Sequence, residues 1–516
     1  MTDSDRRAST GSNSVGRFAL VLHTHLPWLT HHGTWPVGEE WLFQAWGTSY
    51  LRVVDLMHRL GERGRRDVLT LGVTPILAAQ WDDPTVIAEQ RRWLAHWQTR
   101  ASGMAATKNP DRRMAGSREY ADASTALRIF DRDWSSGGSA ALRPLVDSGV
   151  IELLGGPLTH TFTPLLPDRL ARDALIAGLA DTHLRIGTRP RGIWTPECAY
   201  APGLEATYAD VGVRHLMLDG PTLLGAGATT DRAWRLGDSE VAVVGRDLEV
   251  TYRVWSPRRG YPGDRWYRDF HTFDHEWGFR RARVTGHAVP PEEKAPYDPQ
   301  RAAAAVERDA MDFVDVVRRR LLSHSSGDEP PLVVAAFDTE LFGHWWHEGP
   351  VWLERVLDLM PEAGVDIVTL EQATLSAVDR VDPEPSSWGL HKDWHIWTDP
   401  IEIADRQESL TKEALAVLDA THPGGQRSPT HDQLIRELLL ALSSDWAFMV
   451  SHDSAADYAR GRFTGHAEQA QAIVTALARG DAATAHQRAR EAARADHPFG
   501  ALDARRFLTR DPFNSR

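Results

Sequence analysis

Short apolar segments that alternate with helical segments constrain the fold of this chain more than any other feature. They occur at residues 17–22, 67–73, 151–154, 192–194, 215–218, 241–244, 332–337 and 366–370. Strands that alternate with helices form parallel sheets with the helices packed outside. Seven or eight such strands over about 350 residues favour a closed barrel over an open sheet.

The pattern becomes almost wholly helical in two places. Residues 84–145 are polar and helix-rich, and we expect them to form a helical subdomain inserted into the barrel. The periodicity is again helical over 405–419, 430–442, 454–478 and 480–494. The sequence therefore predicts an α/β protein with three parts: a disordered tail at 1–15, a barrel domain at 16–375 and a helical C-terminal domain at 376–516.

Composition excludes several classes of function. The 516 residues carry a formal net charge of −13, with 58 Lys and Arg against 71 Asp and Glu. No block of basic residues could neutralise a run of phosphates, so we expect no nucleic-acid partner. The single cysteine, Cys198, excludes an intrachain disulfide. We find neither a signal peptide nor the roughly 18 apolar residues of a membrane span, and we expect a cytoplasmic protein without a membrane partner.

Two carboxylates follow predicted strands and define the predicted site. Glu197 follows the segment Gly192–Trp194, and Asp338 follows the apolar run Val333–Phe337. In a parallel barrel the carboxyl ends of the strands carry the active site. Retaining glycosyl transfer needs one carboxylate as nucleophile and a second as proton donor. The arrangement therefore predicts sugar chemistry.

Each carboxylate also has a structural interpretation. Glu197 could cap the helix that follows it, because carboxylates are common in the first turn of a helix. Asp338 could be a buried structural aspartate, and Glu340 competes with it for the catalytic role.

Two histidines, His23 and His25, end the first predicted strand. They could form a metal pair, contact sugar hydroxyls or serve only structure. A hydrolytic zinc site would need a third ligand from elsewhere, and the chain has no His-Glu-x-x-His motif and no cysteine cluster. We favour sugar contact and predict no metal and no cofactor.

Tryptophan is abundant, with 20 residues. Indole rings offer flat apolar faces that match the C–H faces of a pyranose. Eight lie in polar, loop-like contexts, where we expect recognition surfaces more often than core: Trp28, Trp35, Trp194, Trp266, Trp345, Trp346, Trp388 and Trp397.

Five separated segments resemble, in order, the motifs of glycoside hydrolase family 57. They are His23–Pro27, Gly155–His160, Trp194–Glu197, Ala336–His344 and the stretch from Ser387 through Trp397. The resemblance covers about residues 17–470 and places Glu197 at the nucleophile position and Asp338 at the acid/base position. It implies a distorted (β/α)7 TIM-like barrel, an inserted helical subdomain, a helical C-terminal domain that contributes to the substrate cleft, and no metal.

Within that family the chain most resembles the α-1,4-glucan branching enzymes. Gly260–Asp264 and Tyr267–Phe270 look like their flexible catalytic loop, and Ser443–Trp446 also matches. The resemblance implies a retaining enzyme that cleaves α-1,4 links and forms α-1,6 branches, with an α-glucan as its partner. The expected substrate contacts are His23, His25, Trp28, His160, Tyr261, Arg268, Gly286, Trp388, Trp397 and Asp445.

Other functions stay open at this point. An α-glucan hydrolase or a 4-α-glucanotransferase could use the same scaffold and the same first step. A metal-dependent polysaccharide deacetylase also uses His and Asp at strand ends, and a non-catalytic glucan-binding protein would need only the aromatic surfaces. The sequence does not indicate an oligomeric state.

Overall fold

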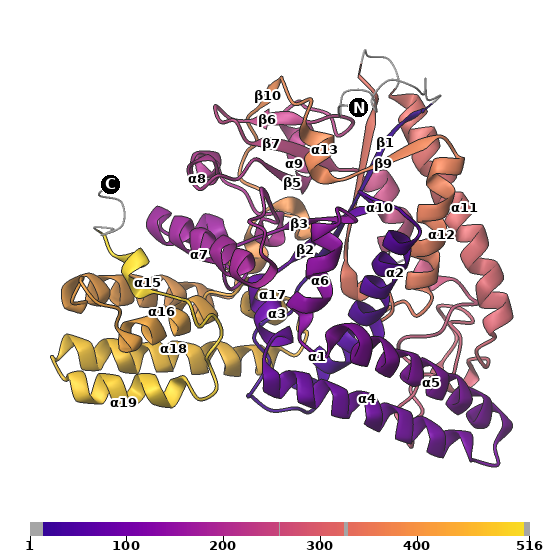
Figure 1. Cartoon of the computed structure of the whole chain (residues 1–516), viewed down its shortest axis with the longest axis horizontal. Helices are drawn as coiled ribbons and strands as arrows, with labels where there is room; N and C mark the ends of the chain where they lie inside the picture. Colours follow the sequence, from indigo (N-terminus) through magenta and orange to yellow (C-terminus); the bar gives the residue numbers. More distant parts are fainter. Residues whose placement is uncertain (1–13, 257–258, 325–328, 510–516) are drawn as a thin grey trace, which may run out of the picture.

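The computed structural model describes residues 14–256, 259–324 and 329–509. The tail predicted at 1–15 falls mainly on residues 1–13, which lie outside the described residues. Among the described residues, no helix has the length and apolar content needed to cross a membrane. Figure 1 shows the strands in the upper centre, a long helical pair at the lower edge and the C-terminal helices to one side.

The strands form two sheets. In one sheet the order is β3–β2–β1–β8, with β9 pairing the first half of β1; in the other it is β4–β5–β7–β6–β10. The seven strands that line the barrel are β1 (Gly16–Thr24), β2 (Leu69–Val73), β3 (Ile151–Leu154), β4 (Gly192–Ile193), β5 (His215–Asp219), β7 (Ala242–Arg246) and β8 (Leu332–Asp338). The pairs within this set that form ladders are all parallel.

Two backbone junctions join the sheets into a ring. Gly155, which follows β3, donates to the Gly192 carbonyl at 3.1 Å and accepts from the Trp194 amide at 2.9 Å. A Cβ atom at Gly155 would lie 2.6 Å from Cδ2 of Leu179, so the close packing at this junction favours glycine. On the other side the Asp247 amide donates to the Val334 carbonyl at 2.8 Å. The result is the predicted distorted seven-stranded barrel, with two short junctions in place of a continuous ladder.

The eight strands expected from the sequence are all present, the last as β9 (Val365–Val368). Two strands were not expected: β6 (Trp234–Leu236) and β10 (Arg380–Val381). They extend the second sheet beyond the ring, and β6 runs antiparallel to β7. Segments of three and two residues are too short to show alternation, so their pattern carries no signal.

Helices cover the outside of the strands (Figure 1). They are α1 (Glu39–Ala45), η2 (Trp46–Tyr50), α2 (Leu51–Glu62), α3 (Pro75–Trp81), α7 (Asp168–Ile186), α8 (Leu204–Asp210), α9 (Gly220–Gly225), α10 (Leu248–Trp255), α11 (Pro299–Ser323), α12 (Gly349–Glu362) and α13 (Leu370–Thr374). Local chemistry sets their ends. For example, α11 begins after Asp298, whose side chain accepts two backbone amides, and α7 ends at the left-handed Gly187.

The inserted segment contains α4 (Pro84–Ala105), α5 (Pro110–Ile129), η3 (Phe130–Trp134) and α6 (Gly138–Asp147). The first two form the long pair at the lower edge of Figure 1. Asp83 and Asn109 cap their first turns. The helices approach closely at Gly116, where a side chain would lie 2.4 Å from the Ala105 amide nitrogen.

The C-terminal part contains α14 (His395–Thr398), α15 (Ile401–Thr421), α16 (Pro429–Ala441), α17 (Ser444–Ser451), α18 (Ala456–Ala478) and α19 (Ala482–Ala492). The short helix α17 was not expected. These helices share one hydrophobic cluster with Trp28, Leu158 and Phe162 from the loops that follow β1 and β3. The C-terminal helices therefore pack directly on the carboxyl-end loops of the barrel.

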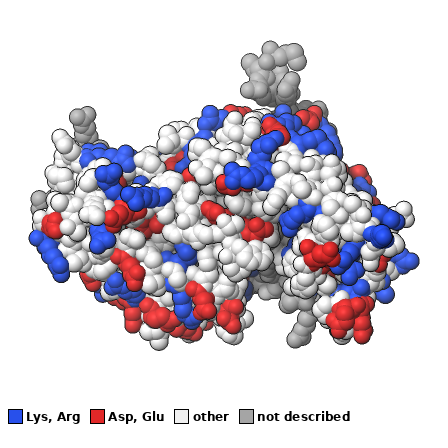
Figure 2. Space-filling model, turned by 90° about the horizontal axis from the view of Figure 1, so that it is seen from below, with Lys and Arg blue, Asp and Glu red and all other residues white. Residues whose placement is uncertain are grey.

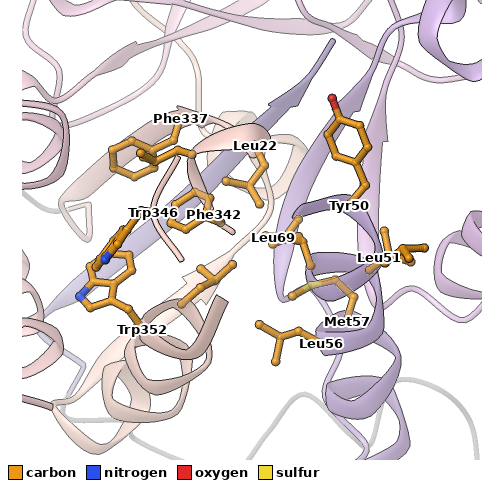
Figure 3. Packing of buried hydrophobic residues seen from close by; sticks show 14 of the residues in the cluster. Leu22, Tyr50, Leu51, Leu56, Met57, Leu69, Phe337, Phe342, Trp346 and Trp352 are labelled. Carbon is orange, nitrogen blue, oxygen red and sulfur yellow. The ribbon is translucent and has the colours of Figure 1, made fainter. Parts of the chain in front are cut away.

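The main core lies between the barrel strands and the helices of the N-terminal half. Figure 3 shows Leu22 of β1 beside Phe337 and Phe342, with side chains of α2 opposite. Several of the loop-context tryptophans are buried in this structure. Trp28, Trp194, Trp346 and Trp397 are at most 4% exposed, because the loops that carry them fold back over the strand ends. Trp35, in contrast, is 76% exposed.

Removing core volume at the central strand should destabilise the protein. We expect Leu22→Ala to lower the free energy of unfolding by about 2–5 kcal/mol, because Leu22 is fully buried and a cavity would remain. Leu375→Ala is the matched control, since that side chain is 80% exposed and its loss should cost less than about 0.5 kcal/mol. Urea denaturation followed by tryptophan fluorescence measures both; equal losses would contradict this assignment of the core.

Candidate active site

Glu197 lies in a tight turn directly after β4. The residues Pro196–Cys198 form one 3-10 turn, and both Glu197 (φ 62°) and Cys198 (φ 50°) have left-handed backbones. Such conformations cost about 1–3 kcal/mol for residues other than glycine and cluster at functional sites. The next helix, α8, begins only at Leu204, so Glu197 is not its cap. The turn instead directs a carboxylate into the interior.

Two hydrogen bonds hold the Glu197 carboxylate. The Ser444 hydroxyl donates to Oε1 at 2.7 Å, and the Trp388 indole donates to Oε2 at 2.8 Å. The Trp388 amide also donates to the Glu197 carbonyl, at 2.8 Å. Burial raises the pKa of Glu197 to about 7, while the two side-chain hydrogen bonds lower it by favouring the charged form.

Asp338 is the last residue of β8 and pairs in register with His23 of β1. It keeps part of its surface exposed, unlike Glu197, which is 7% exposed. Burial raises the pKa of Asp338 to about 6, while the positive charges of Arg246 and His25 act to lower it. The carboxyl group is therefore poised to exchange a proton near neutral pH.

Glu340 is engaged in a different way from Asp338. It is 4% exposed, accepts a hydrogen bond from the Tyr50 hydroxyl and accepts the His25 amide at 3.4 Å. Burial, with the charge of Asp338, raises its pKa to about 8. β8 ends at Asp338 and a 3-10 turn follows, so the alternation that would set the two carboxyls on one strand face does not continue.

Aromatic rings connect the two carboxylates. The His23 ring stacks on Trp194 with 4.3 Å between centroids, and Trp194 lies 5.1 Å from Trp388, which holds Glu197. The Arg246 guanidinium, whose charge acts on Asp338, lies 5.4 Å from the centre of the Trp388 ring. The strand partner of Asp338 and the indole that holds Glu197 thus belong to one cluster.

Three histidines form a stack beside this cluster. His25 and His160 lie 3.8 Å apart, and His23 and His160 lie 5.2 Å apart. Burial lowers the pKa of His23 and of His160 well below the usual range, so both rings are neutral. Both ring nitrogens of His23, Nε2 of His160 and the Trp194 indole are buried and have no hydrogen-bond partner in the described part of the chain.

Unpaired buried polar atoms are costly unless a ligand completes their hydrogen bonds. Neutral imidazoles offer both a donor and an acceptor, and so do sugar hydroxyls. These nitrogens therefore suit a polyhydroxylated ligand.

His25 also connects the barrel to helix α17. Its Nε2 lies 2.9 Å from Asp445, and its Nδ1 lies 3.0 Å from the Thr74 hydroxyl. Burial alone would raise the pKa of Asp445, but His25 holds it at about 2. The ligand atoms of His25, His160 and Asp445 lie within 4.8 Å of one another, close enough to share a cation. The expectation that the reaction uses no metal stays a prediction.

Two residues of this site were not predicted. Ser444 lies in the segment Ser443–Trp446, in which only Asp445 was predicted to contact the substrate. Arg246 ends β7, is 8% exposed and is paired with Asp219 at 2.8 Å. A charged residue at the end of an apolar strand is the same signal that identified Asp338, so Arg246 could have been found in that way.

Trp28 and Trp397 lie in the cluster beneath the C-terminal helices. Trp28 is 1% exposed, and its indole donates to the Ala495 carbonyl at 3.2 Å. Trp397 is 2% exposed and stacks on Phe162 at 4.5 Å. A pocket of about 400 Å³ borders this stack, with Leu166, Ser443 and Ser444 also in its wall. Trp397 and Phe162 therefore adjoin a cavity that reaches the serine bonded to Glu197.

Three further predicted contacts lie on the loop between α10 and α11. The Tyr261 hydroxyl donates to Asp312 of α11 at 2.5 Å, and its ring lies 6.0 Å from Trp352. Arg268 pairs with Glu119 of α5 at 2.6 Å. Gly286 forms part of a turn in the same loop. In this structure Tyr261 and Arg268 are thus bonded to α11 and α5, and their roles as substrate contacts stay predictions, as does that of Gly286.

The sequence matches known families along most of its length. A family model described as glycosyl hydrolase family 57 matches residues 19–384. This chain belongs to glycosyl hydrolase family 57. A second model, described as the C-terminal part of 1,4-alpha-glucan branching enzymes, matches residues 407–507.

The relatives of this family 57 chain include branching enzymes and an α-amylase. A Mycobacterium tuberculosis protein named probable 1,4-alpha-glucan branching enzyme is 50% identical over 97% of this chain and 99% of its own length. A solved family 57 branching enzyme from Thermococcus kodakaraensis, in complex with glucose, has a TM-score of 0.90 at 29% identity, with 96% and 97% of the two chains covered. An α-amylase from Thermotoga maritima has a TM-score of 0.85 at 26% identity, with 96% and 99% covered.

Removing the hydroxyl donor should raise the pKa of Glu197. A hydrogen bond to a charged group is worth about 1.5–3 kcal/mol, so we expect Ser444→Ala to move the midpoint upward by about one pH unit or more. Infrared difference spectra against Glu197→Gln isolate this carboxyl during a pH titration. Ser443→Ala is the control, because its hydroxyl donates to Asp445 and not to Glu197. An unchanged midpoint in Ser444→Ala would contradict the role of this hydrogen bond.

Proposed function

We propose that this chain is a retaining 1,4-α-glucan branching enzyme. It cleaves an α-1,4 link of a glucan and transfers the released chain to a C6 hydroxyl as an α-1,6 branch. The observation that carries the proposal is the pair of carboxyl groups at this cluster: Trp388 donates to Glu197, and Asp338 pairs in register with His23. The chain also matches family 57 and the branching-enzyme model. The composition also supports a cytoplasmic location.

In the first step Glu197 attacks the anomeric carbon of the bound glucan. Asp338 gives its proton to the departing glycosidic oxygen, and a covalent glycosyl-enzyme forms. Ser444 and Trp388 hold the two oxygens of Glu197, so the attacking carboxylate needs little reorganisation. The neutral rings of His23 and His160 bind sugar hydroxyls beside it.

In the second step Asp338, now a carboxylate, removes the proton of an incoming C6 hydroxyl. That oxygen attacks the anomeric carbon, and Glu197 leaves with its electron pair. Two displacements at one carbon retain the α configuration. Transfer competes with hydrolysis, because water can attack the same intermediate. A branching enzyme must therefore position the acceptor glucan and keep water from the site.

The loop between α10 and α11 is our candidate for the water-excluding lid. As the structure places it, Tyr261 is bonded to Asp312, so a closing motion would have to break that contact. Residues 257 and 258 of this loop lie outside the described residues. An α-glucan hydrolase or 4-α-glucanotransferase is the alternative function. The fold shared with a Thermotoga maritima α-amylase is compatible with hydrolysis.

Linkage analysis tests the proposal. After incubation with amylose, we expect new α-1,6 linkages in the proton NMR spectrum and few new reducing ends. Glu197→Gln and Asp338→Asn should each lower the rate by at least about 10³-fold while the fold is retained, because each removes an essential group. Glu340→Gln is the matched control and should retain more activity than Asp338→Asn. Reducing ends without α-1,6 linkages would favour the hydrolase.

The pH profile tests the assigned protonation states. Burial raises the pKa of Glu197 to about 7 and that of Asp338 to about 6, whereas the first step needs Glu197 ionised and Asp338 protonated. A bound glucan would cover the exposed part of Asp338 and raise its pKa further, since desolvation disfavours the charged form. Glu197 keeps its two donors and changes less.

We therefore expect the alkaline limb of kcat, which reports the complex, to lie at higher pH than the alkaline limb of kcat/KM, which reports the free enzyme. Initial rates on amylose across pH 5–9 give both limbs. Coincident limbs would contradict the proposed effect of substrate on Asp338.

A further inference from the structure

A second group of side chains lies where the loop after β1, the start of α4 and the segment after α19 meet. It consists of His31, Asp83 and His497, whose ligand atoms all lie within 4.8 Å of one another. His497 Nε2 lies 3.0 Å from Asp83 Oδ2, and His31 Nε2 lies 3.8 Å from the same oxygen. Neither the family resemblance nor the proposed reaction uses these residues.

The spacing matches that of zinc ligands. Nitrogen and oxygen ligands lie about 2.0–2.2 Å from tetrahedral zinc, which places them about 3.3–3.6 Å from one another. The distances from Asp83 Oδ2 to the two histidine nitrogens, 3.0 and 3.8 Å, bracket that range. Small movements of the side chains would therefore be enough to receive an ion.

Each ligand is oriented by the surrounding structure. The other oxygen of Asp83, Oδ1, accepts the Thr85 and Val86 amides as the cap of α4, which leaves Oδ2 facing the histidines. His31 has a left-handed backbone (φ 67°), and its amide donates to Glu39. Its Nε2 is buried and has no hydrogen-bond partner among the described residues. Ligand orientation by neighbouring groups is typical of metal sites.

His497 lies on the solvent-exposed side of this group. Its side chain is 43% exposed, whereas that of Asp83 is 10% exposed. An ion held by three protein ligands would keep a fourth position for water on this side. Two neutral imidazoles and one carboxylate would also leave the bound divalent ion only partly neutralised.

In a neighbouring group of similar composition, both nitrogens of the central histidine already have hydrogen-bond partners. His32, His466 and Asp496 also lie within 4.8 Å of one another. However, His466 is bonded through Nδ1 to Glu437 at 2.9 Å and through Nε2 to the Arg462 guanidinium at 2.8 Å. Both of its nitrogens are in use, and a guanidinium would repel a cation. This second group is a charge network that joins the loop after β1 and the segment after α19 to helix α18.

We propose that His31, Asp83 and His497 form a binding site for a divalent transition-metal ion of the zinc class. The ion would join the loop after β1 to the segment after α19. That loop begins at His25, which contacts Asp445 in the active site. The site therefore stabilises the junction that places His25, and it takes no part in the reaction itself.

Cobalt titration of the full-length, chelator-treated protein tests the proposal. Co²⁺ in tetrahedral coordination absorbs visible light much more strongly than octahedral Co²⁺, and excess Mg²⁺ suppresses binding to surface carboxylates. We expect one strongly absorbing Co²⁺ per chain, displaced by Zn²⁺. His31→Asn, Asp83→Asn and His497→Ala should each weaken binding at least tenfold, because each removes one of three ligands.

The substitutions are chosen to preserve the fold. Asparagine tolerates the left-handed backbone at position 31 and remains a good helix cap at position 83. His32→Asn is the control from the group of His32, His466 and Asp496, and it should leave Co²⁺ binding unchanged. Zn²⁺ should also raise the melting temperature of the wild type and not that of Asp83→Asn.

Two results would overturn the proposal. One is an unchanged Co²⁺ signal in all three ligand variants. The other is a signal that is lost in Asp445→Asn and kept in Asp83→Asn, which would place the ion among His25, His160 and Asp445.

Discussion

The structure depends on the hydrogen bonds that hold one buried carboxylate. Glu197 accepts hydrogen bonds from the Trp388 indole and the Ser444 hydroxyl. These donors are separated from Glu197 by 191 and 247 positions in the sequence. A buried carboxylate without such donors would be protonated or would destabilise the fold. The barrel, the segment after β10 and helix α17 must therefore all be in place before the site exists. This explains why the C-terminal helices share a hydrophobic cluster with barrel loops instead of forming a separate body.

Burial acts on every acidic group near the site, and the neighbours decide how each one responds. Burial raises the pKa of Glu197, Asp338 and Glu340 alike. Glu197 has two neutral donors, which favour the anion and fix its direction. Asp338 has only nearby positive charge and partial exposure, so its proton can move. Glu340 has a pKa of about 8 because of burial and the charge of Asp338, although the hydrogen bond from Tyr50 acts to lower it. Asp445 is the opposite case, because contact with His25 outweighs burial and keeps it ionised. The four carboxyl groups thus have four different sets of neighbours, and of these only Asp445 has a pKa below its usual range.

The barrel strands and the two carboxylates could be predicted because their signal is local. An apolar run followed by an acidic residue is visible in a single sequence, and parallel strands place their carboxyl ends on one face. The strands β6 and β10 and the helix α17 could not be predicted, since segments this short show no periodicity. The burial of the loop-context tryptophans could not be predicted for a different reason. Trp28 and Trp397 lie in polar sequence, but their loops are covered by C-terminal helices, and that contact is not encoded near either residue. The packing of Tyr261 against α11 and α12 is likewise a property of the tertiary structure.

Charge on the visible surface differs from charge at the junctions inside. Figure 2 shows acidic and basic side chains interspersed on one face, as suits a protein whose proposed partner is an uncharged glucan. At the contact between the loop after β1 and the segment after α19, in contrast, histidines and carboxylates are concentrated. Adjacent residues alternate between two groups there: His31 and His497 face Asp83, while His32 and Asp496 face His466. Hydrophobic packing alone, through Trp28, would hold the two segments together without fixing their register. Directional contacts between imidazoles and carboxylates can fix it, and that register sets where His25 meets Asp445.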